Sequence, residues 1–156
     1  MRFSGHDTFH CREQWLLKGL QLIDKQGYSD SFKNEESIYQ LGVGKNMVRS
    51  IQHWLKAFAL VDENNSFTSY ANDIFSDKKY DPYLENIGTL YILQYYLTST
   101  SYSSVFDLIF RGFFEDKANS EFSEIQIISY LKRLLNEQQV KSFTEKTLKS
   151  DFKVFI

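Results

Sequence analysis

The sequence has few of the residues that break helices or cross-link small folds. Its 156 residues include one proline, seven glycines and one cysteine. The single cysteine, Cys11, excludes an internal disulfide, and the start of the chain lacks the basic and apolar regions of a signal peptide, so we expect a cytoplasmic protein. The scarcity of proline and glycine, in a chain with long apolar periods of about 3.6 residues, predicts a mainly α-helical fold.

Strong net charge and long apolar runs are also missing. The formal net charge is −2, so DNA binding would require a local basic patch and not a globally basic chain. No stretch approaches the ~18 consecutive apolar residues of a membrane helix, and we expect no membrane partner. Hydrophobic residues form 42% of the chain and charged residues 24%, values typical of a folded globular protein.

The first half of the chain has the element order of a winged helix-turn-helix. Apolar periodicity predicts helices over residues 12–25, 34–41 and 46–59, with Asn34 as the cap of the second. "GVG" predicts a tight turn before the third helix, whose apolar face carries Val48, Ile51, Leu55 and Phe58.

After the third helix, "LVDENNSFTS" predicts a small β-hairpin around an Asn-Asn-Ser turn. This hairpin is the expected wing. We therefore assign residues 1–79 to a winged-helix-like domain with an extended segment, "MRFSGHDTF", at its start.

The second half is predicted to be a helical domain, residues 80–156. Pro82 disfavours helix before it, which places a boundary nearby. Residues 84–98 and 104–114 are so apolar that we expect two buried helices packed on each other. "FSEIQI" predicts a capped helix from Glu124 to about Gln138.

A Thr144 cap predicts a last helix that runs to the final "KVFI". These exposed apolar residues favour a chain cut from a longer protein over a docked C-terminal helix. The last helix also carries Lys146, Lys149 and Lys153, and Lys141 precedes it. Two interpretations stay open: a second helix-turn-helix at the C-terminus, or a solvated lysine face.

The Gly44–Lys45 pair could belong to a phosphate-binding P-loop or to the turn of a helix-turn-helix. A P-loop needs a glycine five residues before the pair, a hydroxyl residue after it and a preceding strand. Those positions hold Tyr39 and Asn46, and the preceding pattern is helical. The sequence favours the turn.

The helix after this turn is the best candidate for a DNA-binding element. No Asp or Glu occurs between Ser37 and Val61, so the local charge is positive. With the apolar face inward, helical spacing places six DNA-type side chains outward: Lys45, Asn46, Arg49, Gln52, His53 and Lys56. Arg49 and Gln52 are suited to base edges, and the lysines to phosphates. The alternative is a solvated face that contacts protein.

Catalytic and metal-binding patterns are weak. His6, Asp7, His10 and Cys11 form one cluster of metal-type ligands, but a structural zinc site usually draws a second ligand pair from elsewhere in the chain. No feature activates Cys11 as a nucleophile with His6 or His53. We expect no metal, no cofactor and no enzymatic activity.

Several motifs resemble the bacterial family catalogued as domain of unknown function 4007. They are "FSGHDTF", Arg12, "WLLKG", "LGVGKNMVRSIQHWLKAF", "DPYLE" and "LKSDFKVF". Members tend to occur near genes for DNA phosphorothioation and phage defence, so the resemblance implies a DNA-handling accessory protein. The family's opening motif maps here to a polar set that could form a site, chiefly Ser4, His6, Asp7 and Arg12; a structural lock, with Arg12 pairing to Asp7 or capping the first helix, is the alternative.

Together these observations predict a DNA-binding accessory or regulatory protein, with duplex DNA as its partner. The alternative is a protein-interaction module in a defence or modification complex, with no direct DNA contact. Other defence or modification proteins and a second copy of the chain, as a homodimer, are the further partners that the sequence leaves open.

Overall fold

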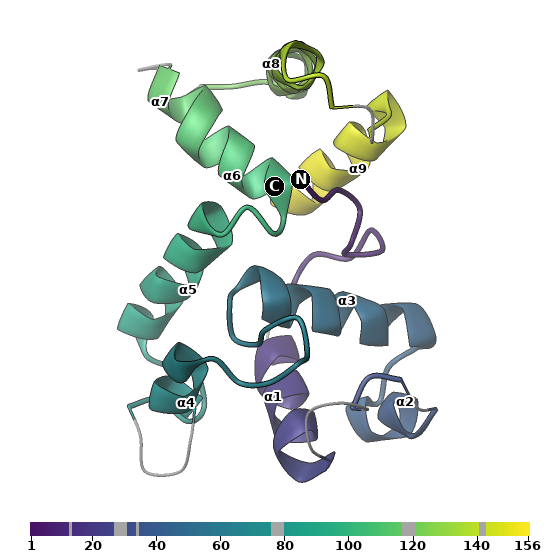
Figure 1. Cartoon of the computed structure of the whole chain (residues 1–156), viewed down its shortest axis with the longest axis vertical. Helices are drawn as coiled ribbons and strands as arrows, with labels where there is room; N and C mark the ends of the chain where they lie inside the picture. Colours follow the sequence, from purple (N-terminus) through teal and green to yellow (C-terminus); the bar gives the residue numbers. More distant parts are fainter. Residues whose placement is uncertain (13, 27–30, 34, 76–79, 117–120, 141–142) are drawn as a thin grey trace.

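The computed structural model describes residues 1–12, 14–26, 31–33, 35–75, 80–116, 121–140 and 143–156, and it is mainly helical, as predicted (Figure 1). In the part of the chain that is described, the only β-type pairing is one isolated bridge. The helices are α1 (Trp15–Gln26), α2 (Glu36–Leu41), α3 (Lys45–Ala57), α4 (Ser69–Phe75), α5 (Ile87–Ser99), α6 (Ser104–Leu108), the π-helical η1 (Ile109–Phe113), α7 (Phe114–Asp116), α8 (Glu124–Glu137) and α9 (Glu145–Phe155).

Helices α1, α2 and α3 pack together around the apolar face that periodicity predicts. Val48, Ile51 and Leu55 on α3 are all buried, in contact with the apolar stripe of α1. Gly19 permits this close packing, because a Cβ at that position would lie 2.7 Å from a Leu55 methyl group. The apolar face of α3 is thereby fixed toward α1, and Lys45, Asn46 and Arg49 remain exposed.

A left-handed Gly42, at φ 66°, ends α2 and starts the turn into α3, as the sequence predicts. The predicted hairpin after α3 is reduced to a single antiparallel bridge, Val61 with Phe67. Between them the Asp62 carboxylate accepts hydrogen bonds from the amides of Asn64 and Ser66, both at 2.8 Å. The turn is therefore closed by a side chain and not by a longer ladder.

Two helix starts in the second half agree with their predicted caps. Ser123 and Gln126 form a capping box at the start of α8, and the Thr144 hydroxyl accepts from the Thr147 amide at the start of α9. The predicted helix over residues 104–114 is instead three consecutive segments, because η1 inserts a π-helical turn between α6 and α7. A π-helical turn of this kind is not encoded in apolar periodicity.

The prediction that residues 84–98 form a buried helix is wrong in part. Helix α5 buries Thr89, Leu93 and Leu97, but Tyr91 is 72% exposed and Tyr95 66%. The composition of the segment is apolar on all sides, so periodicity could not reveal which face lacks a partner.

The two predicted halves of the chain contact each other in the middle of the molecule. Helix α5 connects α1–α4 to α6–α9 in Figure 1, and Trp54 of α3 packs edge-on against Phe106 of α6, with 5.8 Å between ring centroids. The opening segment makes a second connection, from the C-terminal end of α9 down to α1 (Figure 1). The proposed boundary at residue 79, the Asn34 cap and Lys141 lie outside the described residues.

Candidate nucleic-acid interface

The N-terminal end of α3 presents exposed polar and basic side chains. Lys45, Asn46 and Arg49 are exposed, and the Arg49 side chain keeps 56% of its surface open to solvent. The Arg49 guanidinium donates to the Asn46 side-chain oxygen at 2.9 Å and to the Asp7 carboxylate, also at 2.9 Å. Asp7, which is distant in the sequence, thus compensates the charge of Arg49, because α3 itself contains no acidic residue.

The other three positions predicted to face outward on α3 are covered to different degrees. The Gln52 amide donates to the side chain of Asn65 at 2.9 Å, and Lys56, with only 11% of its side chain exposed, donates to the Glu63 carbonyl at 2.8 Å. The outward placement of His53 is wrong, because its ring is only 5% exposed. The opening segment covers the side of α3 that helical spacing leaves free.

Residues 4–8, which we call the opening loop, form a tight turn and not the extended run predicted. Ser4, Asp7 and Thr8 all have positive φ, between 48° and 69°. Such left-handed conformations are uncommon for residues other than glycine and persist where surrounding contacts hold them. The opening loop is therefore held in place by its neighbours.

Asp151 of α9 supplies the main anchor of the opening loop. Its carboxylate accepts from the Ser4 amide at 3.1 Å and from His6 Nε2 at 3.0 Å, and both side chains of the His6–Asp151 pair are at least 98% buried. The other His6 nitrogen, Nδ1, accepts from the Thr8 amide at 3.1 Å, which places the ring proton on Nε2. Both nitrogens of His6 are thereby satisfied.

The polar set of the opening motif is thus divided among separate contacts. Asp7 pairs with Arg49 and not with Arg12, whose guanidinium lies over the Trp15 ring, 5.5 Å from its centroid. Among the described residues, no group of three or more His, Cys, Asp or Glu side chains is arranged to hold a metal ion. Desolvation raises the pKa of the Cys11 thiol to about 12, which opposes nucleophilic use.

His53 differs from His6 in that neither of its ring nitrogens has a hydrogen-bond partner. Its ring packs against His6, Trp54 and Tyr102, with centroid distances of 5.3 to 5.9 Å. Burial, with smaller contributions from His6 and Arg2, lowers the pKa of His53 to about 3, so the ring is neutral at physiological pH. Gly5 makes this packing possible, because a Cβ there would lie 2.3 Å from His53 Nδ1.

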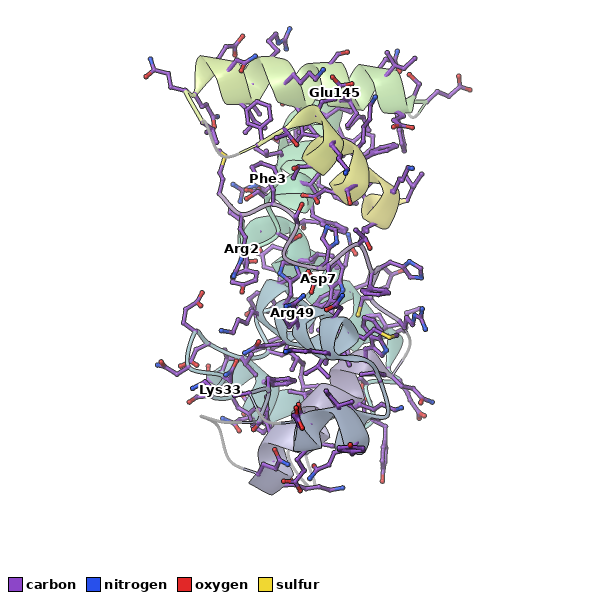
Figure 2. The ribbon with its side chains drawn as sticks, turned by 90° about the vertical axis from the view of Figure 1, so that its right-hand side faces the viewer. Arg2, Phe3, Asp7, Lys33, Arg49 and Glu145 are labelled. Carbon is purple, nitrogen blue, oxygen red and sulfur yellow. The ribbon has the colours of Figure 1, made fainter. Side chains whose placement is uncertain are left out.

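A cavity of about 230 Å³ lies between the opening segment, α3 and the residues before α6. Figure 2 shows Arg2, Asp7 and Arg49 around this part of the molecule, between α9 and α3. Its walls bring together basic and neutral donor groups with one carboxylate: Arg2, Ser4, Gly5, Asp7, Arg49, Gln52, His53, Lys56 and Tyr102. Arg2 and Tyr102 could not be assigned from sequence, because their contribution depends on contacts across about a hundred residues.

Helix α9 carries a second, weaker basic surface. Lys146, Lys149 and Lys153 line a groove with Thr8 of the opening loop. Lys149 forms an ion pair with Glu145 at 2.8 Å within the same helix, and Lys132 of α8 pairs with that same carboxylate. Glu145 therefore compensates part of the basic face of α9.

Comparisons with known proteins identify the family. Two solved structures are similar: "SspB crystal structure", at 27% identity, and "Magnesium ion-bound SspB crystal structure", at 25%. Both have a TM-score of 0.79 and cover 98% of this chain, but only 48% and 47% of their own chains, so this chain spans about half the length of those proteins. No curated protein matches. The family model "Protein of unknown function (DUF4007)" matches residues 3–156, and the chain belongs to that family.

Proposed function

We propose that this chain binds duplex DNA through α3, in the manner of a winged helix-turn-helix, and acts as an accessory or regulatory protein without catalysis. The supporting observation is the exposed N-terminal end of α3, where Lys45, Asn46 and Arg49 stand free of the core. In helix-turn-helix proteins the N-terminal residues of the second helix reach base edges in the major groove. The left-handed Gly42 that ends α2 supports this proposal, because it forms a tight turn before α3.

The contacts divide into two chemical classes. Arg49 and Asn46 have the paired donors and acceptors that read purines, and Lys45 is suited to phosphate. The Asp62 turn follows α3 as a short wing, with Asn64 exposed at its tip. Gln52 and Lys56 have partners in this turn, and Lys56 also adds positive charge beside Arg49.

The cellular setting is proposed from the family resemblance. Genes for DNA phosphorothioation and phage defence often accompany this family, which supports a role in a DNA sulfur-modification or defence system. Phosphorothioate-modified DNA is therefore a probe to compare with unmodified DNA.

Magnesium is not part of the proposed mechanism. One similar structure is described as magnesium-bound. In this chain Asp7 is paired with Arg49 and Asp151 with His6, and the described residues contain no cluster of metal-type ligands. The side chains of the proposed interface do not fit a metal ion, and we assign no step to one.

Fluorescence anisotropy of labelled duplexes, unmodified and phosphorothioate-modified, tests DNA binding. The comparison is between wild type and a Lys45→Ala, Arg49→Ala, Lys56→Ala variant at two salt concentrations. We expect affinity that falls with salt, because bound phosphates release counterions, and loss of most of that affinity in the variant.

The matched control is a Lys18→Ala, Lys25→Ala, Arg133→Ala variant, which removes three exposed cations from α1 and α8. It should bind like wild type. Absence of binding by folded wild type, or equal losses in the two variants, would refute the assignment to α3.

A protein-interaction function is the second candidate, and the exposed face of α5 favours it. Ile87, Tyr91 and Tyr95 are each at least 66% exposed on one short helix. Contiguous apolar surface of this kind often marks a contact with another protein. A Tyr91→Ser, Tyr95→Ser variant that loses partners from a neighbouring-gene pull-down while retaining DNA binding would support this function.

A further inference from the structure

The cavity beside α3 is lined by more cations than carboxylates. Three permanent cations line its volume of about 230 Å³, Arg2, Arg49 and Lys56, against one lining carboxylate, Asp7. Glu63 pairs with Lys56 from outside the lining, at 3.5 Å. Arg2 has no acid partner among the described residues. Its guanidinium lies over the Tyr102 ring, 4.7 Å from the centroid, and donates to the Tyr102 hydroxyl.

His53 gives a second, independent indication of a ligand. Its ring forms part of the cavity wall and is only 5% exposed. Both ring nitrogens are buried without a hydrogen-bond partner. Buried polar groups in folded proteins are almost always hydrogen-bonded, so an unpartnered ring at a cavity wall indicates a missing partner. The neutral ring has one N–H to donate.

The opening loop is built so that this ring remains part of the wall. Asp151 holds Ser4 and His6 in place, and Gly5, with no side chain, lies against the His53 ring. Three left-handed residues in the same turn indicate a conformation maintained by its contacts and not by local preference. The opening loop therefore forms one wall of the cavity in a fixed conformation, and Arg2, Arg49 and Lys56 supply cations to the rest of the lining.

We propose that this cavity binds a phosphate group. Arg2, Arg49 and Lys56 supply the positive charge, the Tyr102 hydroxyl adds a neutral donor, and the His53 ring forms the wall beside them. Guanidinium groups suit phosphate because their fork of N–H donors matches its oxygens. Asp7 competes with the phosphate for Arg49, so binding exchanges an internal ion pair for one with the ligand.

The identity of the phosphate rests on the proposed function, since the cavity adjoins the DNA-binding end of α3. Two sources share the required chemistry: a phosphate of the DNA backbone and a 5′-terminal phosphate. Both are phosphate esters. A duplex with a 5′-phosphate and one with a 5′-hydroxyl have the same backbone phosphates and differ only in the terminal phosphate.

The first experiment titrates inorganic phosphate into the whole chain and follows the ring C–H signals of its three histidines by NMR. Chloride at matched ionic strength is the reference. We expect a saturable shift of the His53 signal, with the signal of exposed His10 unchanged. A His53→Leu variant assigns the signal.

Arg49→Gln should weaken phosphate binding at least tenfold, and the matched Arg133→Gln on α8 should not change it. Arg49 is largely exposed, so its substitution is compatible with folding, and Lys56→Gln provides a second test within the cavity. No saturable His53 shift in wild type, or equal phosphate affinity in both cavity variants and wild type, would overturn the assignment.

The DNA arms separate this inference from the proposed function. Tighter binding of the 5′-phosphate duplex identifies a terminal phosphate. Equal binding of both duplexes, weakened by Arg2→Gln in the cavity wall, identifies a backbone phosphate. Phosphate binding without DNA binding would leave the cavity assignment standing and refute the proposed function. DNA binding that depends on Lys45, with no His53 response to phosphate, would refute the cavity assignment alone.

Discussion

The opening loop has one side toward α9 and another toward α3, and the two sides differ in how completely their polar groups are satisfied. Toward α9, both nitrogens of His6 and both oxygens of Asp151 have partners. Toward α3, both nitrogens of His53 lack them, although the two histidine rings are only 5.9 Å apart. The comparison indicates that the first side fixes the fold and the second is available to a ligand.

The largest effect is expected from breaking the hydrogen bonds that hold the opening loop to α9. Asp151→Ala removes the acceptor of the Ser4 amide and of His6 Nε2, both inside the protein. Because buried donors without acceptors are costly, the free energy of unfolding should fall by about 2 to 4 kcal/mol, measured by urea denaturation. Glu137→Ala, at an exposed ion pair of α8, should cost less than about 1 kcal/mol. Equal costs would mean that Asp151 is not an anchor.

A smaller loss is expected where the loop meets His53. Gly5→Ala places a methyl group 2.3 Å from His53 Nδ1 and should lower the free energy of unfolding by about 1 to 3 kcal/mol through overpacking. Gly44→Ala is the control, because a Cβ there meets nothing within 4 Å. A stable Gly5→Ala protein with unchanged His53 signals would show that the loop does not press on the ring.

The buried His53 ring also predicts that the free energy of unfolding depends on pH. The pKa of His53 is about 3 in the folded chain, below its ordinary value of 6.5, so the unfolded chain binds a proton in this window that the folded chain does not. The contribution of the neutral His53 ring to the free energy of unfolding is fully present above pH 6.5. It is lost as pH falls toward 3, by at most about 1.4 kcal/mol per pH unit.

Urea denaturation across the upper part of this window measures the slope. His53→Leu should reduce it, and His10→Leu, at an exposed position, should not. A slope that is identical in wild type and His53→Leu would contradict a neutral, buried His53.

The smallest effect is expected on α9. Lys149→Ala breaks an exposed ion pair with Glu145 and should leave the free energy of unfolding almost unchanged, because solvent screens such pairs. It should weaken DNA binding much less than Arg49→Ala, as measured by anisotropy. A larger loss with Lys149→Ala would favour the second helix-turn-helix at the C-terminus.

Local signals in the sequence were sufficient for the starts of α8 and α9 and for the inward face of α3. The Ser123–Gln126 capping box, the Thr144 cap and the inward face of α3 depend on residues within a few positions of one another. Helical spacing and backbone capping determine such features, so one sequence reveals them.

The site depends on contacts that no local pattern encodes. His53 was expected outside because helical spacing describes only α3 itself, and the opening loop that covers it lies about forty-five residues earlier in the chain. Asp151 was missed for the same reason, since its partner His6 is 145 residues away. The exposed face of α5 was missed because its few polar residues do not mark one side of a mostly apolar helix.

The most direct test of DNA binding by α3 is the salt dependence of duplex affinity for Arg49→Ala beside Arg133→Ala. Both substitutions remove one exposed arginine from a helix, so they change net charge equally. We predict that Arg49→Ala weakens binding by about 1 to 3 kcal/mol, or lowers the salt slope by about one if the contact is to phosphate, while Arg133→Ala changes neither. The same affinity and slope for both variants would contradict the assignment.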